Sequence, residues 1–174
     1  MGWFVMVVLE RILKGIDFVC VWTGKLAAFL VIILMAAVVY EVISRYAFNA
    51  PTIWAFEIER MVGGSLFVLG FSWVLLQKAH VRVDLFYQRF SPRGKAILDA
   101  VLYLLLVFPL WIWVMPQLIE WTQISWAIQE RSSDSAWRNI IYPFKTVAPI
   151  AIFLLLLGLL ATFIRDIRTI VRGK

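Results

Sequence analysis

The chain has 174 residues, of which 63% are hydrophobic and 16% are charged, with a net charge of +6. Soluble domains carry about 25% charged residues, so this composition excludes an ordinary soluble domain and predicts a membrane protein. The positive charge is explained by attraction to anionic lipids at the membrane surface. It therefore requires no nucleic acid as a partner.

Charged residues are confined to short segments, and the runs between them predict membrane spans. Four runs lack charge, at residues 26–40, 61–77, 100–119 and 146–164. Each has, or approaches, the roughly 20 apolar residues that a helix needs to cross the hydrocarbon core. We therefore expect an all-α membrane protein with one membrane domain over 1–174. Its transmembrane helices are expected at 24–48, 53–78, 95–120 and 145–166, with a loop at 121–144.

The N-terminal segment before the first span predicts an additional, interfacial helix over residues 3–20. Glu10, Lys14 and Asp17 share one face of such a helix, and Trp3 and Phe4 can turn toward lipid. A charged face opposite an aromatic and aliphatic face is typical of amphipathic helices that lie in the membrane surface.

Proline and its neighbours predict where the second and third spans begin. Thr52 follows Pro51 and can cap a helix that begins near Ile53. Ser91 before Pro92 is a second N-cap signal, here with proline at the first helical position. Within the third span, two prolines at positions 109 and 116 are expected to kink the helix.

Lysine and arginine predict the orientation in the membrane. Three lie before the first span, five lie in the connection 78–95 and four follow residue 164, which makes twelve; the other five lie on the opposite side. Because cytoplasmic loops carry the excess of Lys and Arg, both termini are predicted to be cytoplasmic and the 121–144 loop periplasmic. This is the arrangement of a multi-pass protein of the bacterial inner membrane.

Four charged residues, Glu41, Arg45, Glu57 and Arg60, gather near the outer end of the first predicted hairpin. They have two interpretations: an ion or substrate site, or ion pairs that tie the two helices together. The charges are balanced and lie near the interface rather than the midplane, which favours ion pairs. We expect Arg45 to meet Glu57 across the turn.

Small residues in the second span predict close helix packing. Gly63, Gly64 and Gly70 lie in the run "GGSLFVLGFS". Glycine allows neighbouring helix backbones to approach closely in membranes, although this run is not a strict GxxxG motif.

His80, the only histidine, lies in the charged connection after the second span. A single histidine excludes bis-histidine haem, and a zinc site would need Asp84 plus further ligands that are not evident. On a helix or on an extended segment, this stretch presents one polar and one apolar edge, which suits docking better than catalysis. Phosphate-binding loops and nucleophile motifs are absent, so the sequence argues against an enzyme and predicts no cofactor.

The stretch "SRYAFNAPTIWAFEIERMVGGSLFVLGFSWVLLQKAHVRVDLF" resembles the small membrane subunit, or Q-subunit, of tripartite ATP-independent periplasmic (TRAP) transporters. The second half of the chain resembles the family more loosely, at "YPFKTVAPIAIFLLLLGLL". The motif positions, which the resemblance offers as subunit-interface candidates, are Arg45, Tyr46, Phe48, Trp54, Glu57, His80, Val81, Val83 and Asp84.

The resemblance implies a subunit of a sodium-driven secondary transporter that takes up an organic acid. Its partners would be a periplasmic substrate-binding protein, membrane lipids and a large membrane subunit that holds the substrate and sodium sites. This chain would be the fixed scaffold. Two alternatives remain open at this point: a haem- or quinone-associated membrane anchor of a respiratory oxidoreductase, and a purely structural assembly factor.

Overall fold

The structure is a computed structural model that describes residues 2–77 and 90–172. Within these residues the chain is helical, and extended backbone pairs only at an isolated antiparallel bridge between Arg131 and Ile140. The described part contains four helical runs that are long and apolar enough to cross a membrane: Met6–Ala47, Ala55–Leu76, Arg93–Ala127 and Tyr142–Val171. The predicted all-α fold with four spans is confirmed.

The N-terminal helix differs from the prediction. A single helix, α1 (Gly2–Ala47), takes in both the expected interfacial segment 3–20 and the first span. The junction at residues 21–24 contains one glycine, Gly24, and no proline, and one glycine costs a helix only about 1 kcal/mol, so nothing there stops the helix. The separate helix over 3–20 was therefore a wrong prediction. With 46 residues, α1 is about 69 Å long, well beyond the thickness of a hydrocarbon core.

The second helix, α2 (Ala55–Leu76), has 22 residues and is about 33 Å long, which matches one crossing of the hydrocarbon core. Trp54 is the residue that precedes it, and no side chain caps its first turn. The predicted N-cap role of Thr52 is therefore wrong. Both the backbone N–H and the hydroxyl of Thr52 are instead donated to the carboxylate of Glu41 on α1.

The third run is made of α4 (Pro92–Leu102), a π-helical turn η1 (Tyr103–Val107) and α5 (Phe108–Ala127). The Ser91 cap is confirmed, because its Oγ accepts a hydrogen bond from the Gly94 N–H at 3.2 Å. Pro109 has no N–H for the carbonyl of Leu105, and η1 lies directly before it, with the Phe108 N–H bonded to the Tyr103 carbonyl. The helix then continues through Pro116, past the predicted end at residue 120.

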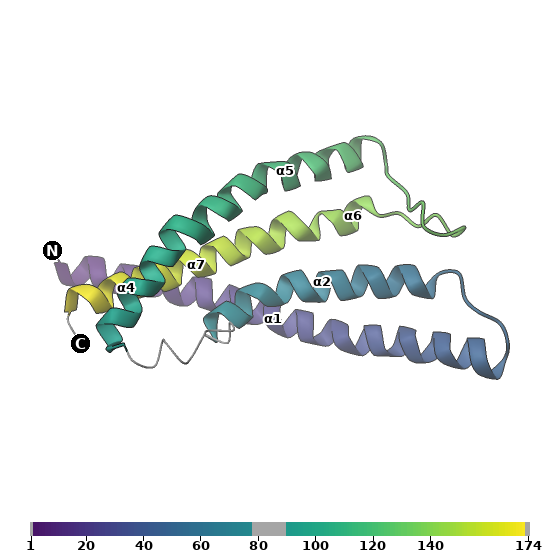
Figure 1. Cartoon of the computed structure of the whole chain (residues 1–174), viewed down its shortest axis with the longest axis horizontal. Coiled ribbons are helices and arrows are strands. Elements are labelled where there is room, and N and C mark those ends of the chain that lie inside the picture. The colour runs from purple at the N-terminus through teal and green to yellow at the C-terminus, as the bar shows by residue number, and fades with distance from the viewer. Residues whose placement is uncertain (1, 78–89, 173–174) are drawn as a thin grey trace.

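The last run consists of α6 (Tyr142–Lys145) and α7 (Val147–Arg172). Figure 1 shows α1 paired with α2 and α5 paired with α6 and α7, while the two chain ends lie together at one end of the molecule. We call this the terminal end. The opposite, or turn, end carries the α1–α2 connection and the loop 128–141.

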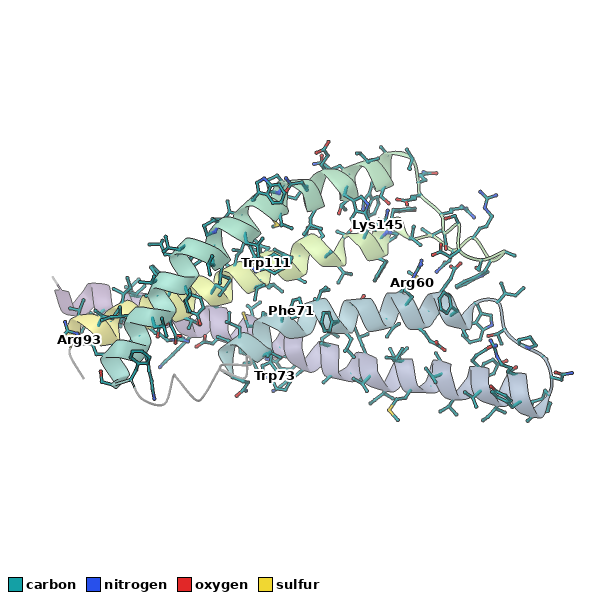
Figure 2. All side chains as sticks on the ribbon, viewed as in Figure 1. Arg60, Phe71, Trp73, Arg93, Trp111 and Lys145 are labelled. Atoms are coloured by element: carbon teal, nitrogen blue, oxygen red, sulfur yellow. The ribbon has the colours of Figure 1, made fainter. Side chains whose placement is uncertain are left out.

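Helix α7 joins the two hairpins, since it contacts α1, α2, α4, α5 and α6. The buried core lies where α2 meets α7, and aromatic residues of α2 and α5 surround it, including Phe71 and Trp111 (Figure 2). Its fully buried members are Leu75, Ile152, Leu155 and Leu159. Large apolar side chains on the remaining faces of α1 and α5 are exposed, as expected for surfaces that meet lipid or another membrane protein.

Candidate functional site

The α1–α2 turn is organised by the carboxylate of Glu41. One oxygen accepts hydrogen bonds from Arg45, at 2.9 Å from Nε and 2.5 Å from Nη2. The other accepts from the Thr52 N–H at 3.0 Å and from the Thr52 hydroxyl. This carboxylate therefore fixes the end of α1 to the chain that leads into α2. Charge-assisted hydrogen bonds of this kind are stronger than neutral ones.

Glu57 does not meet Arg45, so the predicted pair across the turn is wrong. Arg45 is bound to Glu41 one helical turn before it, which is the shortest path for its side chain. The Glu57 side chain is 1% exposed, and its Oε1 accepts a hydrogen bond from the hydroxyl of Ser135 in the loop 128–141. Its other oxygen, Oε2, is buried without a partner among the described residues.

The loop 128–141 is attached to the first turns of α2 by further polar contacts. Arg60 forms an ion pair with Asp134, and the Asn139 amide lies 3.2 Å from the sulfur of Met61. Figure 2 places Arg60 of α2 on the side that faces the loop. Residues far apart in sequence therefore meet at the turn end. Of the four charged residues identified in the sequence, Glu41 and Arg45 belong to the α1–α2 turn, whereas Glu57 and Arg60 contact the loop 128–141.

A buried lysine, Lys145, lies on α6 at the same end (Figure 2). Its Nζ is 2.5 Å from Oε2 of Glu130 and 4.0 Å from the ring centroid of Trp121. The hydrogen bond from Lys145 holds the pKa of the Glu130 carboxyl below its ordinary value. This pairing was not predicted from the sequence.

At the terminal end, ion pairs join α1 to α7. Asp17 is paired with Arg165, and Glu10 lies 3.7 Å from Arg168. Between these pairs and the core, the sulfur of Cys20 is fully buried, 3.8 Å from the carbonyl of Leu154. Two of the three charges predicted for an interfacial helix, Glu10 and Asp17, thus contact α7.

Among the glycines of α2, Gly64 makes the closest approach, because a Cβ there would lie 3.3 Å from the Phe144 ring. A Cβ at Gly63 would be 4.0 Å from Leu34, and at Gly70 it would meet nothing within 4 Å. The glycine with the least space for a side chain was not predicted from the sequence. It is Gly24 of α1, where a Cβ would lie 2.5 Å from the Cβ of Trp73.

The aromatic motif residues lie at the turn end. Tyr46 and Phe48 are 81% and 74% exposed, and Trp54 packs against Tyr40 with ring centroids 5.3 Å apart. Two exposed aromatics beside the turn are available for contact with lipid headgroups or a partner. The remaining motif residues, His80, Val81, Val83 and Asp84, lie outside the residues that the structure describes.

In the described part of the chain, no three His, Cys, Asp or Glu side chains come together as a possible metal site. Residues 34–169, well over half of the chain, match the family model "Tripartite ATP-independent periplasmic transporters, DctQ component". The chain belongs to the DctQ family. Comparison with curated proteins and with solved structures gave no match.

Membership of the DctQ family bears directly on the function of the chain. The chain is a small membrane component of a TRAP transporter, located in the inner membrane, and its family is one of transporter components rather than enzymes. TRAP transporters of this type combine the DctQ component with a large membrane subunit and a periplasmic binding protein. The haem- or quinone-associated anchor is not favoured by this assignment.

Proposed function

We propose that this DctQ-family chain is the fixed scaffold of its transporter, holding the large subunit in the bilayer while that subunit moves the solute. The transported solute is an organic acid, and a sodium gradient drives its uptake through sites in the large subunit. Both termini of the scaffold face the cytoplasm, and the turn end faces the periplasm. The binding protein delivers the solute on that side.

The proposal rests on one observation: the charged groups at the turn end are already bound to one another within the chain. Glu41 is bound to Arg45 and Thr52, Lys145 to Glu130, and Arg60 to Asp134. Groups that transport ions or anionic substrates must exchange partners during a cycle. Charges that are already engaged within one chain suit a static element better than a moving one.

The length of α1 and its exposed apolar side chains support the same role. Helix α1 is long, and many of its large apolar side chains are exposed, with Phe29 at 57% and Met35 at 61%. A long helix with an apolar surface can contact a neighbouring membrane protein over a large area, which a stationary partner of a sliding domain requires.

Co-expression tests the proposal. The tagged chain should co-purify with the large membrane subunit, and deletion of the chain should lower the amount of that subunit in the membrane and abolish uptake. An absorption spectrum of the same preparation addresses the alternative function. Stoichiometric haem in the purified complex, with uptake intact when the chain is deleted, would favour the respiratory anchor instead.

A further inference from the structure

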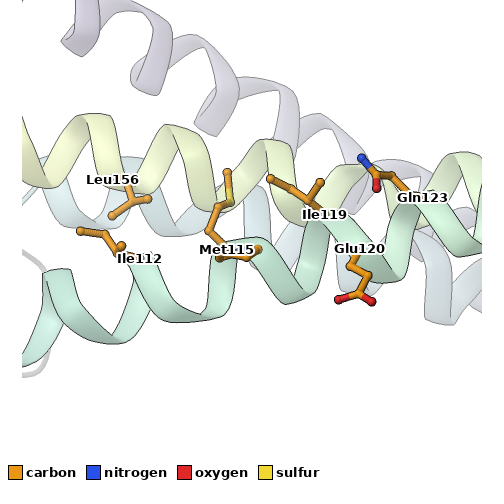
Figure 3. Close-up of a pocket in the computed structure, with 7 residues that line it drawn as sticks. Ile112, Met115, Ile119, Glu120, Gln123 and Leu156 are labelled. Atoms are coloured by element: carbon orange, nitrogen blue, oxygen red, sulfur yellow. The ribbon is translucent and has the colours of Figure 1, made fainter.

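A shallow groove runs along α5 on the side of α7. It encloses about 400 Å³ and is lined mainly by apolar side chains. Figure 3 shows Ile112, Met115 and Ile119 following one another along α5, with Leu156 of α7 beside them and Glu120 and Gln123 at one end. The groove is thus apolar along its length and polar at a single end.

The length of the groove matches one leaflet of a bilayer. From Ile112 to Gln123 the helix rises about 16 Å, and half of a hydrocarbon core is about 15 Å thick. The polar end lies toward the turn end, beside Trp121, and Trp126 follows five residues later. Tryptophan is enriched where the hydrocarbon meets the headgroups, so Glu120 and Gln123 lie at headgroup depth.

The charge at this end selects among headgroups. Glu120 is the only ionisable residue that lines the groove, and in the described part of the chain it makes no ion pair. The nearby Lys145 is already engaged by Glu130 and by the ring of Trp121. A carboxylate without a cation beside it repels an anionic headgroup and attracts an ammonium group.

We propose that this groove is a binding site for a phospholipid whose headgroup ends in a primary ammonium group. One acyl chain lies along Ile112, Met115 and Ile119, and the ammonium donates hydrogen bonds to the carboxylate of Glu120. The Gln123 amide supplies a donor for the phosphate oxygens. The site is independent of which solute the transporter carries.

Native mass spectrometry of the full chain in detergent tests this site. The protein is titrated with phosphatidylethanolamine, with phosphatidylcholine, whose quaternary ammonium has no N–H donor, and with anionic phosphatidylglycerol. The wild type should bind phosphatidylethanolamine about tenfold more tightly than the other two, as expected for a charge-assisted hydrogen bond. Equal binding of all three lipids would overturn the proposal.

Two pairs of variants separate the headgroup contact from the acyl-chain contact. Glu120→Gln should abolish the preference for phosphatidylethanolamine, whereas Glu59→Gln, the same charge change on α2, should keep it. Ile112→Trp fills the groove and should weaken binding of all three lipids. Ile32→Trp is its control, because Ile32 on α1 is exposed to a similar extent, 62% against 59%. A preference that survives Glu120→Gln contradicts the proposal.

A protein partner is the competing occupant, and the assembled transporter distinguishes it from lipid. A photocrosslinking residue at position 119 should react with lipid in the complex with the large subunit, and phosphatidylethanolamine should stay bound on assembly. Crosslinking of position 119 to the large subunit, with release of the lipid, would assign the groove to a protein interface and overturn the lipid site.

Discussion

Glu57 anchors the loop 128–141 through one hydrogen bond, from Ser135 to a carboxylate that is almost fully buried. Glu57→Ala leaves that hydroxyl without its acceptor and opens a cavity, so we expect it to lower the free energy of unfolding by about 1–3 kcal/mol. Glu57→Gln keeps an acceptor and should cost less. Thermal unfolding in detergent measures both variants.

A double-mutant cycle checks the assignment of this bond. Once Glu57→Ala has removed the acceptor, Ser135→Ala should add little further destabilisation, because the two changes remove the same interaction. Fully additive losses in the double variant would mean that the hydrogen bond does not hold the loop.

The pair of Glu130 and Lys145 gives the turn end a dependence on pH. The hydrogen bond from Lys145 lowers the pKa of Glu130 below its ordinary value of 4.5. The pair therefore contributes to stability above pH 4.5. This contribution is lost as the pH falls through the pKa that Glu130 has in the folded protein, because the unfolded chain binds more protons than the folded one over that range. The stability difference between wild type and Glu130→Gln should shrink between pH 5 and pH 3. A difference that stays constant over that range would contradict the pairing.

Helices α1 and α2 are in close contact where Trp73 covers Gly24. A methyl group at Gly24 would come within 2.5 Å of the Trp73 Cβ, which is bonded to the backbone and cannot swing away. We expect Gly24→Ala to destabilise the protein by about 1–3 kcal/mol through overpacking.

Gly15 supplies a matched control on the same helix, because a Cβ there meets nothing within 4 Å. Gly15→Ala should be neutral or raise stability by up to about 1 kcal/mol, since alanine favours the helix. Both variants can be compared by thermal unfolding with circular dichroism. Equal stability of the two would show that α1 and α2 do not pack at Gly24.

The sequence predicted the ends of helices correctly where neighbouring residues determine them, and poorly where contacts between distant residues determine them. Ser91 and Pro92 fixed the start of α4, because capping depends on residues within one turn. The end of α5 was placed too early, since the sequence offers no stop signal before Ala127. The role of Thr52 could not be predicted, because Glu41 binds it from eleven residues away.

For the whole molecule, both chain ends lie at one end of the structure, as an even number of spans requires (Figure 1). The twelve-to-five distribution of Lys and Arg predicts that this end is cytoplasmic. A reporter that is active only in the cytoplasm should work when fused after Lys174 or inserted near Ser91, and should be silent near Ser133. Activity at Ser133 would refute this orientation.

The sequence predicted which charged residues lie at the candidate site, but not which of them pair. The sequence identified Glu41, Arg45, Glu57 and Arg60 as one cluster at the end of the first hairpin. It could not show that Glu57 and Arg60 contact the loop 128–141, because those contacts bridge more than seventy residues. Long-range pairs of this kind depend on how the hairpins pack, which hydrophobic runs and charge counts do not specify.

In the proposed scaffold, the charges at the turn end hold the structure together and do not carry ions. The most direct measurement is sodium-dependent uptake per assembled transporter for Glu41→Gln and Arg45→Ala, with the assembled complex quantified in parallel. We expect less assembled complex in both variants, with unchanged uptake and sodium dependence for each complex that forms. Normal assembly with loss of sodium dependence would contradict the proposal and would make these residues part of the transport path.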